Sequence, residues 1–309
     1  MPRAALYDSV GDPDVLYVGE VETPPLGENE VCVRVKAAGL NPVDAKTRSG
    51  LIPAPPGAPF PRGTGSDFAG VVVAAGPEAT YWDGAPVAAA DEVMGWTTGA
   101  SLREELVVPD TDLARKPVGL QFEAAGALST AGLTALAGLR LLDIGPDDTV
   151  LVSAAAGGVG MVYSQLAIAR GAAVVGTASR SNHEFLRSIG VVPVEYGQGL
   201  ADRVRAVQPA PITAVQDGVG RETVLAGLEL GVDPERICTI VDYPAIQEFG
   251  IRTTGRYERR PEDLLEVAEQ VERGDVRIRI ERVFPLEQVV EAYALLAGRH
   301  LAGKIVVTP

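Results

Sequence analysis

Strand-length apolar runs alternate with helix-length segments between residues 126 and 252, and this alternation restricts the fold more than any other feature of the chain. The strand-like runs read TVLVSA, AAVVGTA, VVPVEY, ITAVQD and RICTIVD. The helix-like segments that separate them read GMVYSQLAIARG, NHEFLRSIG, LADRVRAV and RETVLAGLELG. Regular alternation of this kind is typical of a doubly wound sheet of parallel strands covered by helices. We therefore expect an α/β domain over residues 126–252.

Residues 1–125 follow a different pattern. Short runs such as VCVRVKAAG, FAGVVVAAG and EELVVP are separated by glycine and proline, which predicts a β-rich, mostly antiparallel domain. After residue 252 come a charged amphipathic helix, RPEDLLEVAEQVERG, a second helix, LEQVVEAYALLAG, and a closing strand, KIVVTP. This tail is too short for a domain of its own, so we expect residues 253–309 to return to the first domain.

Charge and cysteine content limit the partners. The formal net charge is −14, which argues against binding to nucleic acid or to an anionic membrane, because either surface would repel the protein. The most apolar window, residues 124–139, is broken by three glycines and is expected to be a buried helix. Cys32 and Cys238 lie far apart in strand-like runs, so neither a disulfide framework nor a CxxC motif is present. We expect reduced core thiols in a cytoplasmic protein.

The segment AAAGGVG, residues 154–160, connects the first strand of the α/β domain to its first helix. Gly157 allows the backbone to approach a pyrophosphate, and Gly160 allows helix and strand to pack closely. The helix N-terminus adds free N–H donors and the positive end of a dipole. A glycine turn alone is common between strand and helix, but four further strand and helix alternations follow this one. We predict a dinucleotide site formed by Ala156, Gly157, Gly158, Val159 and Gly160.

The next strand ends in TASRSNHEF, where an enzyme specific for NAD would carry an acid. Ser179 and Arg180 stand there instead, and a hydroxyl and a guanidinium suit a 2′-phosphate. This pattern favours NADP. The alternative is that Arg180 is a solvated loop residue and that Asn182 merely caps the next helix.

Nine blocks of sequence occur in the order and spacing of one enzyme superfamily. They are AAGLNPVDAKTRSG, GSDFAGVVVAAG, DEVMGW, ELVVP, AGALSTAGLTAL, AAAGGVG, QDGVG, FPLEQVVEAY and GKIVV. On these blocks the chain resembles the zinc-free quinone oxidoreductases of the medium-chain dehydrogenase/reductase superfamily. The resemblance implies a Rossmann cofactor domain with a GroES-like catalytic domain, NADPH as cofactor, and a small-molecule quinone or enone as substrate.

The resemblance also assigns residues to the cofactor. Asn41 and Thr134 fall near the nicotinamide, and Ser179, Arg180 and Tyr196 fall near the adenosine 2′-phosphate. Asp217, in the QDGVG block, is a further cofactor-binding candidate. For Tyr196 the alternative of a core aromatic at a strand end stays open.

No metal site is expected. In zinc-dependent members of the superfamily, ligands occupy the positions that match Asn41, Ser66 with Asp67, and Gly126. These residues do not form a zinc ligand set. Ala302 stands where relatives often carry a basic residue, which removes one phosphate contact and weakens the NADPH assignment.

Three residues near the first of these positions are candidates for catalysis. The cofactor supplies the hydride, so the protein has only to position an electron-poor acceptor and stabilise developing negative charge. Asn41 is expected to donate a hydrogen bond to the acceptor's carbonyl oxygen, while Asp44 and Lys46 orient the loop. A purely structural role for Asp44, as the cap of the turn after Pro42, stays open. An enoyl-thioester reductase and a non-catalytic NADPH-binding protein are the alternative functions.

A homodimer is expected from the resemblance alone. The fifth strand of the α/β domain, RICTIVD, is apolar and would lie at the edge of its sheet. An uncovered strand edge invites pairing with a second chain.

Overall fold

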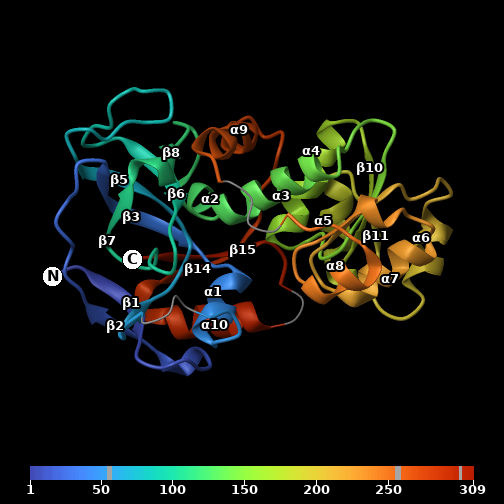
Figure 1. Ribbon diagram of the computed structural model, residues 1–309, viewed down its shortest axis with the longest axis horizontal. Coiled ribbons are helices and arrows are strands. Elements are labelled where there is room, and N and C mark those ends of the chain that lie inside the picture. Colours follow the sequence, from blue (N-terminus) through green and yellow to red (C-terminus); the bar gives the residue numbers. More distant parts are fainter. Residues whose placement is uncertain (54–57, 255–258, 299–300) are drawn as a thin grey trace. The chain divides into compact units, whose positions relative to one another are not determined.

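The computed structural model describes residues 1–53, 58–254, 259–298 and 301–309, and the chain forms two compact units (Figure 1). The first unit comprises Met1–Thr130, Arg259–Glu272 and Arg279–Pro309, and the second comprises Ala131–Glu258 and Arg273–Ile278. The sequence predicts domain boundaries after residues 125 and 252. In the structure the corresponding boundaries fall after Thr130 and Glu258. The sequence patterns contain no signal for the grouping of residues 273–278 with the second unit.

A sheet of five parallel strands forms the centre of the second unit, in the order β11-β10-β9-β12-β13. Its strands are β9 (Thr149–Val152), β10 (Ala173–Thr177), β11 (Val192–Val194), β12 (Ala214–Asp217) and β13 (Ile237–Thr239). The helices are α3 (Ser129–Leu141), α4 (Gly158–Ala169), α5 (His183–Ser188), α6 (Leu200–Val207), α7 (Arg221–Glu229) and α8 (Tyr243–Phe249), with short 3₁₀ turns η3 (Arg180–Asn182) and η4 (Pro234–Arg236). The predicted doubly wound parallel sheet is confirmed. Because the chain order reverses at β9, loops that follow its carboxyl end are the expected place for a ligand.

The sequence pattern explains these elements. All four residues of β9 and all four of β12 are buried, as expected for strands covered on both faces. Helix α6 buries Leu200, Ala201 and Val204 and carries charged side chains on its other face, so it covers the sheet with one apolar stripe.

The outer edge of β13 differs from the expectation of an uncovered strand. The N–H of Thr239 donates to the carbonyl oxygen of Arg252 at 2.9 Å, and the N–H of Arg252 donates to the carbonyl oxygen of Ile237 at 2.8 Å. Cys238 and Arg252 form an isolated parallel bridge. The expectation that β13 offers a free edge for pairing is therefore wrong, because the backbone of the chain itself occupies that edge.

The first unit contains two sheets. The smaller has the order β2-β1-β4, and the larger has the order β14-β15-β3-β5-β6-β8, with β7 paired to β3. The strands are β1 (Arg3–Tyr7), β2 (Leu16–Glu20), β3 (Glu30–Gly39), β4 (Arg62–Gly63), β5 (Asp67–Ala75), β6 (Glu92–Trp96), β7 (Glu105–Pro109), β8 (Leu113–Arg115), β14 (Ile280–Pro285) and β15 (Lys304–Thr308). The helices are α1 (Pro42–Arg48), α2 (Phe122–Gly126), α9 (Pro261–Glu272) and α10 (Val289–Ala297), with 3₁₀ turns η1 (Pro13–Val15), η2 (Asp110–Asp112) and η5 (Leu286–Gln288). Among the strands described in this unit, only β14 and β15 pair in parallel, so the prediction of a mostly antiparallel β-rich domain is confirmed.

The C-terminal strand determines which residues meet near α1. β15 runs antiparallel to β3, with Val306 opposite Gly39, and the N–H of Leu40 donates to the carbonyl oxygen of Ile305 at 2.9 Å. The end of the chain therefore borders the segment that enters α1. No helix within the described ranges is long and apolar enough to cross a membrane.

Candidate functional site

The turn between β9 and α4 is built by residues without large side chains. Ala154 adopts a left-handed backbone with φ of 47°, and the N–H of Gly157 donates to its carbonyl oxygen at 2.8 Å. A Cβ atom on Gly160 would lie 2.3 Å from that oxygen and 2.8 Å from the Cα of Ala155. Both are backbone atoms that cannot move aside cheaply, so only glycine fits here. The turn and the helix start are therefore packed directly against each other.

Helix α4 begins without a side-chain cap. Gly157 is its N-cap residue and makes no capping hydrogen bond through a side chain. The first N–H groups of a helix have no partner within the helix, and together with the helix dipole they attract an anion. Gly157, Gly158 and Val159 are partly exposed, whereas Ala156 is buried. The predicted phosphate-binding residues thus lie together at the carboxyl end of β9.

Arg180 follows β10 and lies on the surface. Its side chain is 82% exposed, and its Nε lies 2.8 Å from a carboxylate oxygen of Glu195. Ser179 is hydrogen-bonded to Ser181 at 3.0 Å between their hydroxyl oxygens. Tyr196 is 47% exposed, which removes the alternative of a core aromatic. The Arg180 guanidinium, after β10, and the Glu195 carboxylate, after the neighbouring strand β11, therefore lie next to each other.

Asn182 does not cap the helix that follows it. Its side chain makes no capping hydrogen bond to α5, and its amide nitrogen lies 3.3 Å from the hydroxyl oxygen of Ser179. The capping alternative for Asn182 is therefore wrong. Thr134, a further candidate in this unit, lies on α3 and is buried.

Asp217, the last residue of β12, is fully buried and organises the loop that follows it. One carboxylate oxygen accepts from the N–H groups of Val219 at 3.0 Å and Gly220 at 2.9 Å, and from the hydroxyl of Ser153 at 3.0 Å. The other accepts from the hydroxyl of Thr239 at 2.7 Å. Gly220, at φ of 130°, adopts a backbone conformation that favours glycine. Asp217 thus shapes the loop at the strand end with both of its oxygens.

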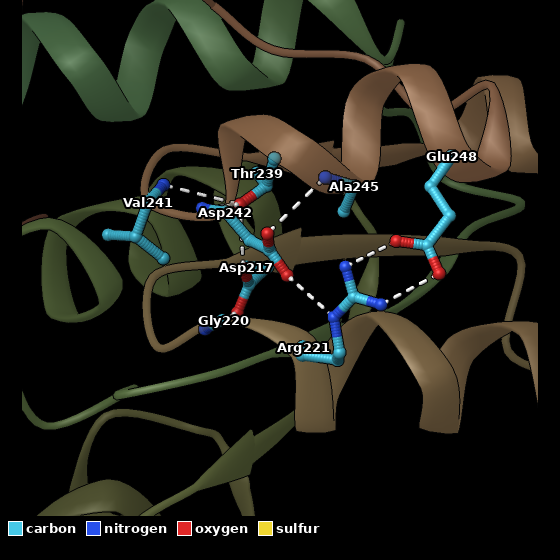
Figure 2. Close-up of polar contacts among 8 residues, drawn as sticks. All are labelled: Asp217, Gly220, Arg221, Thr239, Val241, Asp242, Ala245 and Glu248. Atoms are coloured by element: carbon cyan, nitrogen blue, oxygen red, sulfur yellow. Dashed lines mark hydrogen bonds and ion pairs between the residues drawn. The ribbon is translucent and has the colours of Figure 1, made fainter.

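A second cluster ties the loop after β13 to α7 (Figure 2). Arg221 forms a two-point pair with the Glu248 carboxylate at 2.8 and 2.5 Å, and its Nε lies 3.6 Å from Asp242. Asp242 accepts from the N–H of Ala245 at 3.3 Å and caps α8. The N–H of Asp242 in turn donates to the Thr239 hydroxyl at 3.0 Å. These contacts hold the loops at the carboxyl ends of β12 and β13 together.

Asn41 lies at the centre of a buried polar network in the first unit. Its carboxamide oxygen accepts from the ammonium of Lys304 at 2.5 Å. Its carboxamide nitrogen donates to Asp67 at 2.9 Å and to the carbonyl oxygen of Gly39 at 3.4 Å. The other oxygen of Asp67 accepts from the N–H of Thr130 at 2.9 Å and from its hydroxyl at 2.6 Å. Both hydrogens of the Asn41 amide are therefore engaged within the unit.

Asp44 joins this network through Asn41 and Ser66. One carboxylate oxygen accepts from the N–H of Asn41 at 2.9 Å, which is a helix-capping contact, and the other accepts from the Ser66 hydroxyl at 2.5 Å. Burial raises the pKa of the Asp44 carboxyl to about 7, although the Ser66 hydrogen bond lowers it. Asp44 therefore does cap the start of α1, and it also carries a proton that exchanges near neutral pH. Lys46 is partly exposed on the same helix.

Comparison with known proteins assigns the chain to a family. Residues 27–118 match the alcohol dehydrogenase GroES-like domain, and residues 175–307 match the model described as zinc-binding dehydrogenase. A quinone oxidoreductase from Pseudomonas aeruginosa is 32% identical over 343 aligned positions, covering 100% of both chains. The chain belongs to the quinone oxidoreductase family of the medium-chain dehydrogenase/reductase superfamily.

Two further relatives carry informative names. An NADPH-dependent alkenal/one oxidoreductase from Arabidopsis thaliana is 29% identical over 99% of this chain and 79% of its own. The structure of the Escherichia coli quinone oxidoreductase complexed with NADPH superposes with a TM-score of 0.84, at 25% identity, over 99% of this chain and 100% of its own. The similarity to members of the quinone oxidoreductase family thus extends through both units.

The description of the matched family model implies a zinc ion. The side chains of this chain do not fit one. Asn41 and Ser66 hold two of the three positions that match zinc ligands, and both are engaged with neighbours. At the third position, a Cβ atom on Gly126 would lie 2.5 Å from the carbonyl oxygen of Ala37. Within the described ranges, no group of three His, Cys, Asp or Glu side chains is placed to hold a metal ion. The positive charge next to Asn41 is instead the ammonium of Lys304.

Sequence reasoning missed Lys304, Glu195 and Thr130. Lys304 belongs to the GKIVV block, yet nothing in that block indicates that its ammonium is buried. Its burial depends on the pairing of β15 with β3, which joins residues more than 260 positions apart. Glu195 directly precedes Tyr196, so the neighbouring acid was visible in the sequence.

Proposed function

We propose that the chain is an NADPH-dependent oxidoreductase that transfers hydride to an electron-poor acceptor, a quinone or an α,β-unsaturated carbonyl compound, without zinc. The observation that carries this proposal is the turn after β9, where a Cβ atom on Gly160 would lie 2.3 Å from the Ala154 carbonyl oxygen. A bare turn before an uncapped helix suits a pyrophosphate. The names of the quinone and the alkenal/one oxidoreductase relatives support the choice of acceptor.

The cofactor would be held mainly by the second unit. In the proposal, Ala156, Gly157, Gly158, Val159 and Gly160 bind the pyrophosphate. The 2′-phosphate contacts Ser179, Arg180 and Tyr196. As the family resemblance implies, Thr134 and Asn41 serve the nicotinamide end, while Asp217 shapes the loop that follows β12. When bound, NADPH supplies the hydride.

The first unit would supply the groups that act on the acceptor. Asn41 can donate to a carbonyl oxygen only by giving up its bond to Asp67 or to Gly39. Ser66 and Asp44 form a hydroxyl and carboxyl pair that holds a proton near neutral pH. Quinones and enones need less polarisation than alcohols or aldehydes, so a site with these groups and without a metal suits them.

We further propose that the protein is a cytoplasmic homodimer. The cytoplasmic location rests on Cys32 and Cys238, which are unpaired and buried. The dimer rests on the resemblance to quinone oxidoreductases, because the edge of β13 is already bonded to the backbone of Arg252. Pairing through this side of the sheet would have to involve the segment that contains Arg252.

A screen of acceptors tests the proposed activity. NADPH oxidation is followed with quinones, enones, enoyl thioesters and aldehydes, next to protein-free controls. We expect turnover with quinones or enones, and the same turnover after treatment with a chelator. Turnover confined to enoyl thioesters would indicate a thioester reductase instead, and activity that depends on zinc would contradict the proposal.

A further inference from the structure

Lys304, the first residue of β15, carries its ammonium inside the first unit. The residue is 4% exposed, and Asp67 beside it is fully buried. A buried ammonium costs free energy unless acceptors surround it. Its Nζ atom lies 2.5 Å from the carboxamide oxygen of Asn41 and 3.5 Å from a carboxylate oxygen of Asp67. The lysine is thus committed to two residues of the polar network.

The strand register explains how Lys304 reaches Asn41. Val306 pairs with Gly39 in an antiparallel ladder. When this ladder is continued by two residues, from Val306 back to Lys304 and from Gly39 forward to Asn41, Lys304 lies opposite Asn41. The contact is therefore set by the backbone of two paired segments and does not depend on a flexible loop.

Lys304 and Asp67 together determine which way the Asn41 carboxamide points. The oxygen faces the ammonium, and the nitrogen faces the carboxylate. A flipped amide would place its NH₂ group against the ammonium and its oxygen against the carboxylate, so all favourable contacts would become repulsive. Without Lys304, one of the two charges that specify this orientation is lost.

We propose that Lys304 is a positioning residue of the candidate active site, whose ammonium fixes the Asn41 carboxamide and balances the Asp67 carboxylate beside Asp44 and Ser66. This inference rests on the proposed function, because it gives Lys304 its role through Asn41 and Asp44.

The charge balance of the network provides a signature of this role. The groups that face Asp44 are the Ser66 hydroxyl, the Asn41 N–H, the Asp67 carboxylate, the Lys304 ammonium and the Tyr293 phenol from α10. Burial is the largest cause that raises the pKa of Asp44; Asp67 raises it further, and Lys304 lowers it. Burial also holds the pKa of Tyr293 well above its ordinary value, so this phenol stays neutral. Loss of the ammonium therefore raises the pKa of Asp44.

The test compares two buried lysines. Lys304→Met removes the ammonium at nearly constant length, and Lys304→Arg keeps the charge. Lys116→Met is the matched control, because Lys116 is also buried and its ammonium pairs with Glu92 at 2.8 Å. For each variant we measure NADPH binding, kcat as a function of pH, and the titration of the Asp44 side-chain carboxyl by ¹³C NMR, assigned with Asp44→Asn.

In Lys304→Met we expect kcat to fall about 10- to 100-fold, the loss typical when a residue that orients a metal-binding side chain is removed. The affinity for NADPH should stay nearly unchanged. The Asp44 titration should move to higher pH. Lys304→Arg should recover most of the activity, and Lys116→Met should lose stability while keeping the wild-type titration. A folded Lys304→Met protein with wild-type kcat and an unshifted Asp44 titration would overturn the inference, as would the same shift in Lys116→Met.

Two further arms keep the outcomes separate. If Lys304→Met does not fold, the double variant with Asp67→Asn removes the unpaired buried carboxylate. That variant should fold and keep a low kcat, and wild-type kcat in it would overturn the inference. If none of the acceptors supports NADPH oxidation by the wild-type protein, the proposed function fails. The NMR titration of Asp44 still decides the role of Lys304 in that case.

Discussion

Asp44 is a residue whose ionisation depends strongly on folding. Burial raises the pKa of its carboxyl from 3.8 to about 7. Between these values the folded state holds a proton that the unfolded state has released. The contribution of Asp44 to the free energy of unfolding is therefore present at low pH and is lost as pH rises through this window.

We predict that Asp44→Asn gains stability relative to the wild type as pH rises from about 4 to about 7. The relative change is at most on the order of 4 kcal/mol, from the size of the pKa difference. Melting temperatures of both proteins across this range provide the measurement, with Asp147→Asn as the control at an exposed aspartate. If the melting temperatures of the wild type and Asp44→Asn differ by the same amount at every pH, Asp44 is not buried as a neutral acid.

Arg180 and Glu195 are the residues on which we expect the choice of cofactor to depend. Arg180→Ala should weaken NADPH binding about ten-fold and leave NADH nearly unchanged, since one exposed charge-assisted hydrogen bond is lost. Arg180→Glu should weaken NADPH further, because it repels the phosphate. Glu195→Gln should strengthen NADPH relative to NADH, since it removes a carboxylate 2.8 Å from the guanidinium.

Titration of both cofactors against the wild type and these variants measures the ratio of the two affinities. Equal losses for NADPH and NADH in Arg180→Ala would mean that Arg180 supports loop order and does not read the phosphate. A ratio unchanged by Glu195→Gln would mean that the acid is too well solvated to matter.

Among the elements, the start of α4 is tightly constrained by its packing against the turn that precedes it. Gly160→Ala would place a methyl group 2.3 Å from the Ala154 carbonyl oxygen, so turn and helix must separate. Overpacking of this kind costs about 1 to 3 kcal/mol. We expect a lower melting temperature and weaker binding of both NADPH and NADH.

Gly145→Ala is the matched control, because a Cβ atom there meets nothing within 4 Å. Calorimetry and cofactor titration compare the two variants. Wild-type affinity in Gly160→Ala would contradict the assignment of this turn to the pyrophosphate.

Elements of the second unit could be predicted well because each carries a local signal. The run TVLVSA and the glycines after it specify β9 and the start of α4 without reference to the rest of the chain. The network around Asn41 could be predicted only in part. Asn41 and Asp44 are three residues apart and share a helix start, whereas Lys304 reaches them through pairing of β15 with β3. The covered edge of β13 was missed for the same reason, since Arg252 lies in a segment with no strand pattern.

At the scale of the whole molecule, we predict a homodimer in solution. The prediction rests on family resemblance, and the structure adds that β13 is bonded to the segment containing Arg252. Light scattering across a range of protein concentrations measures the mass directly. The mass of a single chain, 32.3 kDa, at every concentration would refute the dimer.

The central claim is that bound NADPH is oxidised by an electron-poor acceptor on this protein. The most direct measurement mixes the protein, loaded with one equivalent of NADPH, with a quinone and separately with an enone, and follows the reduced cofactor through a single turnover. We predict that bound NADPH disappears with at least one of these acceptors, and that the Gly145→Ala control behaves like the wild type. NADPH that binds but stays reduced in the presence of every acceptor would contradict the account, and would make the chain an NADPH-binding protein without catalysis.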